Sequence, residues 1–362
     1  MTINDFKSLT PMKYYDNPEP AEGSSAAQKR KDIIQNVNNL YIGSEKHDGD
    51  WSMCIHYTQG QNLIRSRSIS KMTGEYGDYT AKLPHLTAEM NTWPDNTVVL
   101  AEICWNEYGT NANTVGTILR CLPTKAVERQ KEKKLYGLVF DLLMFNGEDL
   151  TQTPYEQRLR RAQAYFNLGH QDGRAATGNF FHTTAIFTDN FAEHADEIIE
   201  AGGEGLVLQL RNNPYMPGTR SAWKSLKLKQ CLPHQDLQVA AILPASRDYN
   251  GIEGDTWQYW ERRNGDLLEK VWVKEGGRPS PDAYPITKPY YFGWPGAIRV
   301  KYKDTITDVA SGLTDEDRTW LATAEAQKQI AAGELWAEVK AMSENDKGAL
   351  RHPVLVRLRN DM

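Results

Sequence analysis

Two apolar runs of buried-strand length constrain most strongly what this chain can fold into. They are NTVVLAEICW at 96–105 and KLYGLVFDLLMFNGEDL at 134–150. Continuous apolar runs of this length are typical of strands that are covered on both faces. The stretch MCIHYTQGQNLIRSRS at 53–68 adds two shorter strands, joined at Gln59-Gly60 as in a hairpin. The sequence therefore predicts a core built on sheets.

Two helices are expected among these strands. One lies in TPYEQRLRRAQAYFNLG at 153–169, where Thr153 can cap the helix, Pro154 suits its first position and Glu156 completes a capping box. The other lies in NFAEHADEIIEAGG at 190–203, ends at two glycines and leads into the strand EGLVLQL. Strands and helices in this mixture predict the α+β class.

The rhythm of the sequence changes near CLPHQD at 231–236. Beyond this point short strands are separated by loops rich in Gly and Pro, with one helix after SGLTDEDR. The predicted strands are LQVAAIL, TWQYWERR, LLEKVWVK, AIRVKYKD, LWAEVKAM and VLVRLR. About five or six short strands in a unit of this size suit a small β-barrel such as an OB-fold. We therefore expect one domain at 1–235 and a second at 236–362, with the first 25 or so residues loosely ordered or wrapped on the surface.

Composition excludes few functions. The chain has 42 Lys and Arg against 47 Asp and Glu, a net charge of −5. This charge does not exclude binding to nucleic acid, because local basic patches provide the attraction. The four cysteines form no C-x-x-C pair, so neither a zinc site nor a disulfide scaffold is predicted. No run resembles a membrane span or the apolar core of a secretory signal, and we expect a cytoplasmic location.

The stretch SEKHDGDW at 44–51 raises a chemical question. Asp48-Gly49 is a common turn dipeptide, and Lys46 beside it can be an ordinary surface lysine. A motif this short matches by chance, so its meaning depends on the rest of the chain. Further along come, in this order, IRSRS, VVLAEICW, LVFDLLMFNGEDLT, EGLVLQ, SLKLK and LRHPVLVRLRND. Each is weak alone, but their joint occurrence over most of the chain is hard to obtain by accident.

This ordered set resembles the ATP-dependent DNA ligases, within the covalent nucleotidyltransferase superfamily that also holds RNA ligases and mRNA capping enzymes. Lys46, Asp48 and Gly49 match the signature K-x-D-G-x-R, FDLLMFNGEDLTQTPYEQRLRR is ligase-like, and LRHPVLVRLRND matches the closing motif of the OB domain. The matches span 41–361 with no helical DNA-binding domain before them, as in minimal bacteriophage ligases. The resemblance implies a nucleotidyltransferase (adenylation) domain of antiparallel sheets with helices, followed by a small OB-fold β-barrel.

The resemblance also implies a reaction at Lys46, whose amine would attack ATP and become linked to AMP. A lysine attacks only when unprotonated, and free lysine has a pKa near ~10.4. The neighbouring cations Lys227 and Lys229 are implied as catalytic residues that lower this pKa and offset phosphate charge. Glu204 matches the family's metal-associated carboxylate and Glu102 a second acid near the ribose or the metal, which would be Mg²⁺ or Mn²⁺.

Other implied contacts to the nucleotide are spread along the chain. Phe140 matches the aromatic that stacks on adenine, although a buried strand aromatic is an equal alternative. Arg67 matches an arginine near the nucleotide or the nick phosphate, whereas Arg65 is expected on a solvated hairpin face. Arg351 and Arg357 match arginines whose forked donors suit the β- and γ-phosphates, reached when the second domain closes over the first.

The first signature departs from the family pattern at two positions. Trp51 stands where the family has an arginine that contacts the ribose, and we expect its ring to pack against the second domain or the hairpin. The adenine-reading acid often found two residues before the lysine is Ser44 here, while Glu45 lies directly beside Lys46.

Three functions stay open at this point. The favoured one is a monomeric ATP-dependent DNA ligase that seals nicked double-stranded DNA in replication, repair or recombination. The second is an RNA ligase or a capping guanylyltransferase, although many RNA ligases lack the OB domain. The third is a catalytically dead fold that only clamps nucleic acid. Such a clamp would tolerate loss of the lysine, yet Lys46, Glu204, Lys227 and Lys229 are all present.

Overall fold

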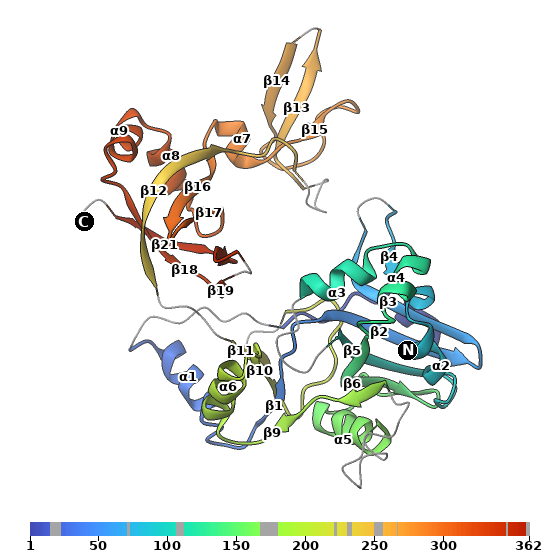
Figure 1. Cartoon of the computed structure of the whole chain (residues 1–362). Helices are drawn as coiled ribbons and strands as arrows, with labels where there is room; N and C mark the ends of the chain where they lie inside the picture. Colours follow the sequence, from blue (N-terminus) through green and yellow to red (C-terminus); the bar gives the residue numbers. More distant parts are fainter. Residues whose placement is uncertain are drawn as a thin grey trace. The chain divides into compact units, whose positions relative to one another are not determined.

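The computed structural model divides the chain into two compact units, Met1–Gln230 and Cys231–Met362 (Figure 1). The sequence predicts this boundary after residue 235; residues 230–233 lie outside the described part of the chain. Among the described residues, no helix is long and apolar enough to cross a membrane. The described residues are 1–14, 23–70, 73–105, 112–166, 180–220, 223–229, 234–249, 256–265, 267–344 and 347–359.

The larger sheet of the first unit contains the apolar runs that were expected to form strands. Its order is β4-β3-β2-β5-β6-β7, with β8 beside β6. Neighbours are antiparallel except β6 and β8, which are parallel. The turn at Gln59-Gly60 joins β2 and β3, which confirms the predicted hairpin. The bounds are β2 (Asp50–Thr58), β3 (Gln61–Ile69), β4 (Tyr76–Asp78), β5 (Thr97–Cys104), β6 (Tyr136–Phe145), β7 (Glu148–Asp149) and β8 (Phe181–Thr183).

A second sheet of the first unit joins segments that are far apart in the sequence. Its order is β11-β10-β1-β9, and all its pairs are antiparallel. This pairing places β10, which directly follows Glu204, between the segment before Lys46 and the strand that contains Lys227. The bounds are β1 (Tyr41–Glu45), β9 (Ile186–Phe187), β10 (Gly205–Leu210) and β11 (Ser225–Lys229).

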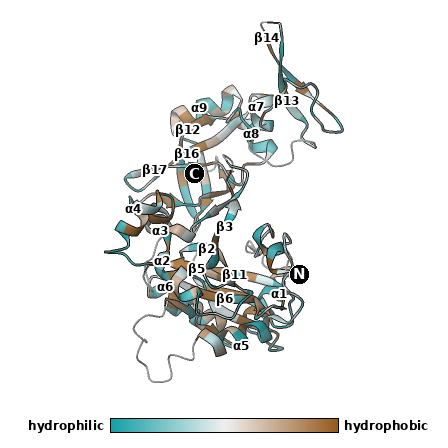
Figure 2. Cartoon of the chain, turned by 90° about the vertical axis from the view of Figure 1, so that its right-hand side faces the viewer, coloured by the Kyte–Doolittle hydropathy of each residue, from teal (hydrophilic) through white to brown (hydrophobic). Residues whose placement is uncertain are grey.

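Helices cover these sheets, and both predicted helices are confirmed. The one near Thr153 begins at Tyr155, but the predicted capping box is wrong: the Thr153 N–H donates to the Leu150 carbonyl, and the Glu156 carboxylate binds two arginines. Apolar residues gather on the strands of this unit, coloured brown in Figure 2. The helices are α1 (Ser25–Ile34), α2 (Pro84–Met90), α3 (Ala112–Leu119), α4 (Pro123–Arg129), α5 (Tyr155–Phe166) and α6 (Phe191–Glu200).

A buried ion pair fastens α5 to β6. Arg158 donates from Nε to Asp141 Oδ1 at 2.8 Å and from Nη2 to Oδ2 at 2.9 Å, and neither side chain is exposed to solvent. The remaining guanidinium nitrogen of Arg158 donates to the carbonyls of Thr153 and Asn213. This two-point geometry satisfies both charges, and burial raises the cost of removing either partner.

The N-terminal segment packs against the rest of the first unit and covers Arg65. Of the two alternatives expected for it, loosely ordered or wrapped on the surface, residues 3–14 exclude the first, because Phe6 is completely buried and Met12 nearly so. Arg65 is not on a solvated face either: its side chain is 1% exposed. Its guanidinium donates to the carbonyls of Phe6 and Leu9 at 2.5–3.2 Å, so it fixes the segment against β3. The sequence of β3 alone does not show that the N-terminal segment covers Arg65.

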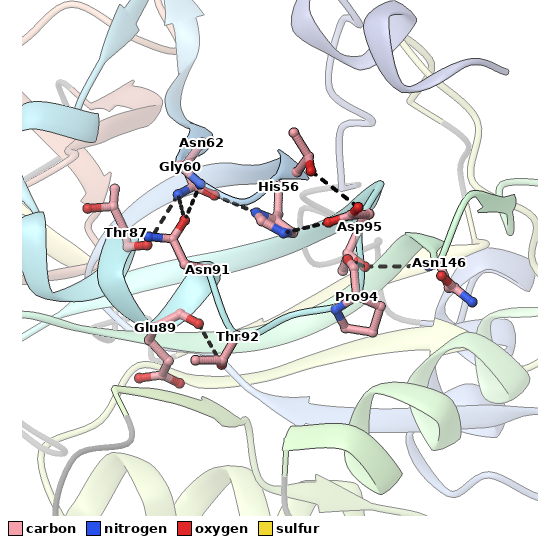
Figure 3. Close-up of polar contacts among 12 residues, drawn as sticks. His56, Gly60, Asn62, Thr87, Glu89, Asn91, Thr92, Pro94, Asp95 and Asn146 are labelled. Atoms are coloured by element: carbon pink, nitrogen blue, oxygen red, sulfur yellow. Dashed lines mark hydrogen bonds and ion pairs between the residues drawn. The ribbon is translucent and has the colours of Figure 1, made fainter.

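Side-chain hydrogen bonds also fix the hairpin of β2 and β3 to its surroundings (Figure 3). Asn62 donates to the Thr87 carbonyl and to Asn91 Oδ1, and Asn91 Oδ1 also accepts from the Gly60 N–H. The ring of His56, completely buried, lies 2.7 Å from Asn62 Oδ1. These contacts tie the turn of the hairpin to α2, and the contact of His56 with Asn62 joins β2 to β3.

The second unit contains the strands predicted for it, but they do not form one sheet. A five-stranded antiparallel sheet has the order β17-β16-β12-β18-β21. The predicted strands TWQYWERR and LLEKVWVK instead form β13 and β14 of a separate sheet with β15, seen at the projecting hairpin in Figure 1. The helix after SGLTDEDR is confirmed as α8.

The strands of the second unit are β12 (Gln235–Pro244), β13 (Tyr259–Asn264), β14 (Leu267–Trp272), β15 (Tyr284–Pro285), β16 (Pro295–Tyr302), β17 (Thr305–Val309), β18 (Trp336–Lys340), β19 (Ser343–Glu344), β20 (Leu350–Arg351) and β21 (Val354–Arg359). Its helices are α7 (Lys288–Phe292), α8 (Asp315–Leu321) and α9 (Ala324–Ala332).

Candidate active site

A cavity in the first unit collects most of the residues that the sequence singles out. Strands from both sheets contribute to it, together with the N-terminal segment and the turn after β1. The lining residues are Tyr14, Ser44, Glu45, Lys46, His47, Trp51, Arg67, Glu102, Phe140, Thr184, Val207 and Lys227. The sequence predicts Glu45, Lys46, Arg67, Glu102, Phe140 and Lys227 as site residues, so one cavity brings these six together.

The pairing of β1, β10 and β11 places the charged groups around Lys46. Glu45 pairs with Leu206, and the Lys46 N–H donates to the Gly205 carbonyl at 2.8 Å. Glu204, directly before β10, therefore lies beside Lys46, and its carboxylate makes an ion pair with the Lys46 ammonium group. On the other side of β10, Lys229 pairs with Gly205. Glu204 and Lys229 do not line the cavity themselves. Glu204 contacts Lys46, which does line it, and Lys229 lies across from Gly205, the residue after Glu204.

Gly49 is required for close approach and not for a tight turn. A Cβ atom at this position would lie 2.4 Å from the Ile103 carbonyl oxygen and 2.8 Å from Glu102 Cγ. Any other residue would push the Lys46 turn away from β5. The absent side chain also lets the Gly49 backbone donate a hydrogen bond to the Glu102 carboxylate. The Asp-Gly dipeptide thus sets the spacing between Lys46 and Glu102.

The surroundings of Lys46 lower its pKa to about 8. Burial is the main cause, because the ammonium form loses its hydration. Lys227 and Lys229 act in the same direction, while Glu102 and Asp48 oppose them. The sequence predicts that neighbouring lysines lower the pKa of Lys46, but it does not predict the larger lowering that burial causes. Roughly a tenth of Lys46 is then neutral at pH 7, against less than a thousandth of a free lysine.

We expect the rate of covalent labelling at Lys46 to rise with pH. Only the neutral amine is a nucleophile, and its fraction grows about tenfold per pH unit below the pKa. With the pKa lowered to about 8, the rate should rise between pH 6 and 8 and level off above pH 9. Single-turnover labelling with α-labelled ATP measures this profile. A rate that is flat from pH 6 to 9, or that still rises tenfold per unit at pH 10, would contradict the assignment.

Two carboxylates flank Lys46 and could hold a divalent cation. Burial raises the pKa of Glu102 to about 7, and the nearby positive charges of Lys46 and Arg67 oppose this rise. Such a carboxylate is costly to keep ionised without a cation beside it. In the part of the chain that the structure describes, no group of three or more His, Cys, Asp and Glu could hold a metal ion. Glu102 and Glu204 therefore fit a metal whose remaining ligands are water and phosphate, as Mg²⁺ commonly has.

Aromatic side chains form another part of the wall. Phe140 on β6 is half-buried, lines the cavity and also packs against core residues of the first unit, so its position fits both a residue that stacks on a base and a strand aromatic of the core. Trp51 is 8% exposed and packs with Phe6, Met12 and other core residues of the first unit. Tyr14, at the end of the N-terminal segment, also lines the cavity and has no motif that marks it in the sequence. At the position where the family has an arginine that contacts the ribose, the cavity is thus lined by the apolar ring of Trp51.

Arg351 and Arg357 belong to the second unit and do not line this cavity. Arg351 ends β20 and is half-buried. Arg357 on β21 is largely exposed, and its Nε donates to Glu338 Oε2 at 2.6 Å. A separate groove in this unit is lined by Glu316, Asp317, Trp320, Leu335, Leu358 and Arg359. Its two carboxylates do not suit a polyphosphate, so the cavity at Lys46 is the better candidate.

Several known proteins are similar to this chain in sequence. A model of the "ATP dependent DNA ligase domain" family matches residues 24–229. A DNA ligase of Methanocorpusculum labreanum is 24% identical over 332 residues, which cover 90% of this chain and 53% of that protein. A DNA ligase of Methanopyrus kandleri is 28% identical over 146 residues, which cover 39% of this chain and 25% of that protein. The chain thus spans about half the length of the Methanocorpusculum labreanum protein, and its match covers a quarter of the Methanopyrus kandleri protein.

Solved structures share the fold at low sequence identity. One, from a structure–function study of Lig E DNA ligases described as binding DNA with a minimal scaffold, aligns with a TM-score of 0.55 and 17% identity, covering 89% of this chain and 93% of that one. Another, described as Pmar-Lig_PreS3, aligns with a TM-score of 0.61 and 16% identity, covering 97% of this chain and 68% of that one. These alignments show the fold of the chain, and the match to the family model shows the family to which it belongs.

Proposed function

The chain belongs to the ATP-dependent DNA ligase family, and from this premise we propose that it seals breaks between a 5′-phosphate and a 3′-hydroxyl in nicked double-stranded DNA. The observation that carries the proposal is the buried Lys46, with its lowered pKa, in a cavity that also presents Lys227, Arg67 and Glu102, while Glu204 makes an ion pair with Lys46 from beside the cavity. This arrangement supports attack by an amine on a phosphate.

The proposed reaction has three steps. The neutral Lys46 amine attacks the α-phosphorus of ATP, so that a nitrogen–phosphorus bond forms and pyrophosphate leaves. The 5′-phosphate at the nick then attacks the same phosphorus, which frees Lys46 and leaves AMP on the DNA end. Last, the 3′-hydroxyl attacks the 5′-phosphorus and AMP departs. Lys227 and Lys229 on β11 offset the negative charge that develops on the phosphates.

Glu102 and Glu204 are the residues that would hold Mg²⁺ or Mn²⁺. Such an ion, when bound, neutralises phosphate charge and polarises phosphoryl oxygens. Glu204 also receives the Lys46 ammonium group in an ion pair, and so orients the amine in the cavity. The Phe140 ring offers a face on which the nucleobase can stack.

We assign the second unit to an OB-fold domain that closes over the cavity when ATP is bound. The support is the five-stranded antiparallel sheet together with the motif that contains Arg351 and Arg357. Arginine pairs with phosphate oxygens through two parallel hydrogen bonds, and the β- and γ-phosphates are the groups that leave in the first step. Domain closure would then be needed for that step alone.

We expect Arg351→Ala and Arg357→Ala to slow the labelling of Lys46 by about ten- to a hundredfold, since a charge-assisted pair contributes about 1.5–3 kcal/mol. The same variants should seal a pre-adenylated nick at nearly the normal rate, because the β- and γ-phosphates have already left. Arg299→Ala is a matched control, since Arg299 lies on β16 of the same unit and is paired with Asp308. Equal loss of both activities would rule out a role confined to the first step.

One assay tests the proposed function directly. The protein is incubated with α-labelled ATP or GTP, and then with nicked duplexes made of DNA or of RNA, or with a capping substrate. We expect the label on the protein with ATP, and sealing of nicked DNA with release of AMP. Labelling by GTP would favour a capping enzyme, sealing of RNA alone would favour an RNA ligase, and absence of any label would remove the proposal.

A further inference from the structure

A carboxylate in the second unit holds one of the two arginines that the proposed first step uses. Glu338 lies in the middle of β18, directly opposite Arg357 of β21. Residues that lie directly opposite each other in antiparallel strands point to the same side of the sheet, so the two side chains meet on one face. The Arg357 Nε donates to Glu338 Oε2 at 2.6 Å. Glu338 itself has no role in the reaction as proposed above.

The other oxygen of this carboxylate is also engaged. His234, which lies directly before β12, places its Nδ1 2.7 Å from Glu338 Oε1. Hydrogen bonds from His234 and Arg357 lower the pKa of Glu338, so the group is ionised at neutral pH. An ionised carboxylate accepts and does not donate, and the Nδ1 of His234 is therefore the donor. The carboxylate is thus held between His234 on one oxygen and Arg357 on the other.

This arrangement presents the outer edge of the Arg357 guanidinium to solvent. A guanidinium carries donors on Nε and on two terminal nitrogens, and the two terminal nitrogens form an edge of their own. Because His234 holds Oε1 of Glu338, the carboxylate contacts Arg357 through Nε. The Arg357 side chain is 64% exposed. Its terminal edge can therefore bind phosphate oxygens while Nε stays on Glu338.

A second ion pair on the same strand shows the contrast. Arg359, two residues along β21 from Arg357, donates from its terminal nitrogen Nη1 to Asp236 Oδ2 at 2.8 Å. Its side chain is 21% exposed. A terminal nitrogen of Arg359 is thus engaged within the unit, whereas Arg357 is held through Nε and is far more exposed. Of the two, Arg357 is the one arranged to bind a further anion.

We propose that Glu338 is a positioning residue for Arg357, which it holds by Nε so that the terminal nitrogens point outward to bind the β- and γ-phosphates of ATP. An exposed arginine without such a contact samples many rotamers, and binding then costs the entropy of fixing one of them. With Glu338 in place, this ordering takes place when the second unit folds, before ATP binds. This inference rests on the proposed function, since it assigns Glu338 a role in the labelling of Lys46.

Two substitutions weaken the contact to different degrees. Glu338→Ala removes it, and Glu338→Gln keeps the shape of the side chain with a weaker acceptor. Single-turnover labelling of Lys46 over a range of ATP concentrations gives the efficiency of the first step. Glu338→Ala should lower this efficiency about three- to tenfold, with Glu338→Gln between it and the original protein. Both variants should seal a pre-adenylated nick at nearly the normal rate, because the β- and γ-phosphates have already left.

A double variant shows whether Glu338 acts through Arg357. A residue that orients the guanidinium has nothing to orient once the guanidinium is gone, so Glu338→Ala should have no further effect in a chain that carries Arg357→Ala. Asp308→Asn is a matched control, because Asp308 forms the cross-strand pair with Arg299 in the same unit, and it should label normally. The melting temperature should change little in each variant, since ion pairs at the surface contribute weakly to stability.

The outcomes separate this inference from the proposed function. Normal labelling of Glu338→Ala would overturn it, and so would faster labelling, which would show that the carboxylate competes with the phosphates. Equal loss of labelling and of sealing, or additive losses in the double variant, would also overturn it. Normal labelling of Arg357→Ala would remove the role of Arg357 and this inference together. All of these results leave the ligase assignment standing, whereas absence of label on the original protein would remove both.

Discussion

Replacement of Lys46 by alanine should reduce the covalent attachment of AMP to background, because the variant lacks the only group that we assign as nucleophile. Lys46→Arg should fail equally, since a guanidinium group stays protonated at any pH that the protein tolerates. Both variants should keep the fold, because the Lys46 side chain contacts the cavity and not the core. Labelling with α-labelled ATP, followed by denaturing electrophoresis, measures the loss.

Two controls make this result specific to the first step. Lys125→Ala removes an exposed lysine on α4 and should label normally. Lys46→Ala should still seal a chemically pre-adenylated nick, because AMP is already on the DNA, whereas Glu204→Ala should be impaired in both assays if a metal acts throughout. A stable AMP adduct on either Lys46 variant would move the nucleophile to another residue.

Breaking the buried pair of Asp141 and Arg158 should have the largest effect on stability. Asp141→Asn keeps the shape of the side chain but leaves the Arg158 charge unpaired where no solvent reaches it. Loss of one partner of such a pair costs about 3–5 kcal/mol. For a unit of this size, this corresponds to a drop in melting temperature of roughly 10 °C. Differential scanning calorimetry of the full chain measures it, with the transition of the second unit as an internal reference.

Removal of both charges provides the control for this prediction. Asp141→Leu combined with Arg158→Met leaves no buried charge, so the double variant should be more stable than Asp141→Asn. It should not recover fully, because the Thr153 and Asn213 carbonyls lose the Arg158 donor. If Asp141→Asn melts within about 2 °C of the original chain, the pair contributes little and the attachment of α5 rests on apolar packing.

The sequence was informative where a residue's role depends on its own strand. The apolar runs at 96–105 and 134–150 became β5 and β6, and the hairpin at Gln59-Gly60 is present. Period and length identify such strands because burial on both faces demands apolar side chains. The sequence motifs also marked Lys46, Glu102, Phe140 and Lys227, and the structure brings these four residues together in one cavity.

The sequence was uninformative where a residue's role depends on a distant segment of the chain. Arg65 has the sequence surroundings of an exposed hairpin residue, but its buried guanidinium donates to the carbonyls of the distant residues Phe6 and Leu9. Thr184 follows a short strand whose pairing with β6 has no sequence signal. His47 occupies the variable position of its motif, so the motif says nothing of it. Each of these residues acquires its partners only when the chain has folded.

The N-terminal segment makes the cavity at Lys46 a composite of segments that are far apart in the sequence. Residues 10–13 hydrogen-bond to Tyr215, Gly218 and Thr219, and Tyr14 forms part of the cavity wall. A synthetic peptide with the sequence of residues 1–14 is therefore a natural partner for a chain that lacks them. The hydrogen bonds of Arg65 to the Phe6 and Leu9 carbonyls would form the joint of such a split enzyme, in which supplying the peptide in trans completes the cavity at a chosen time.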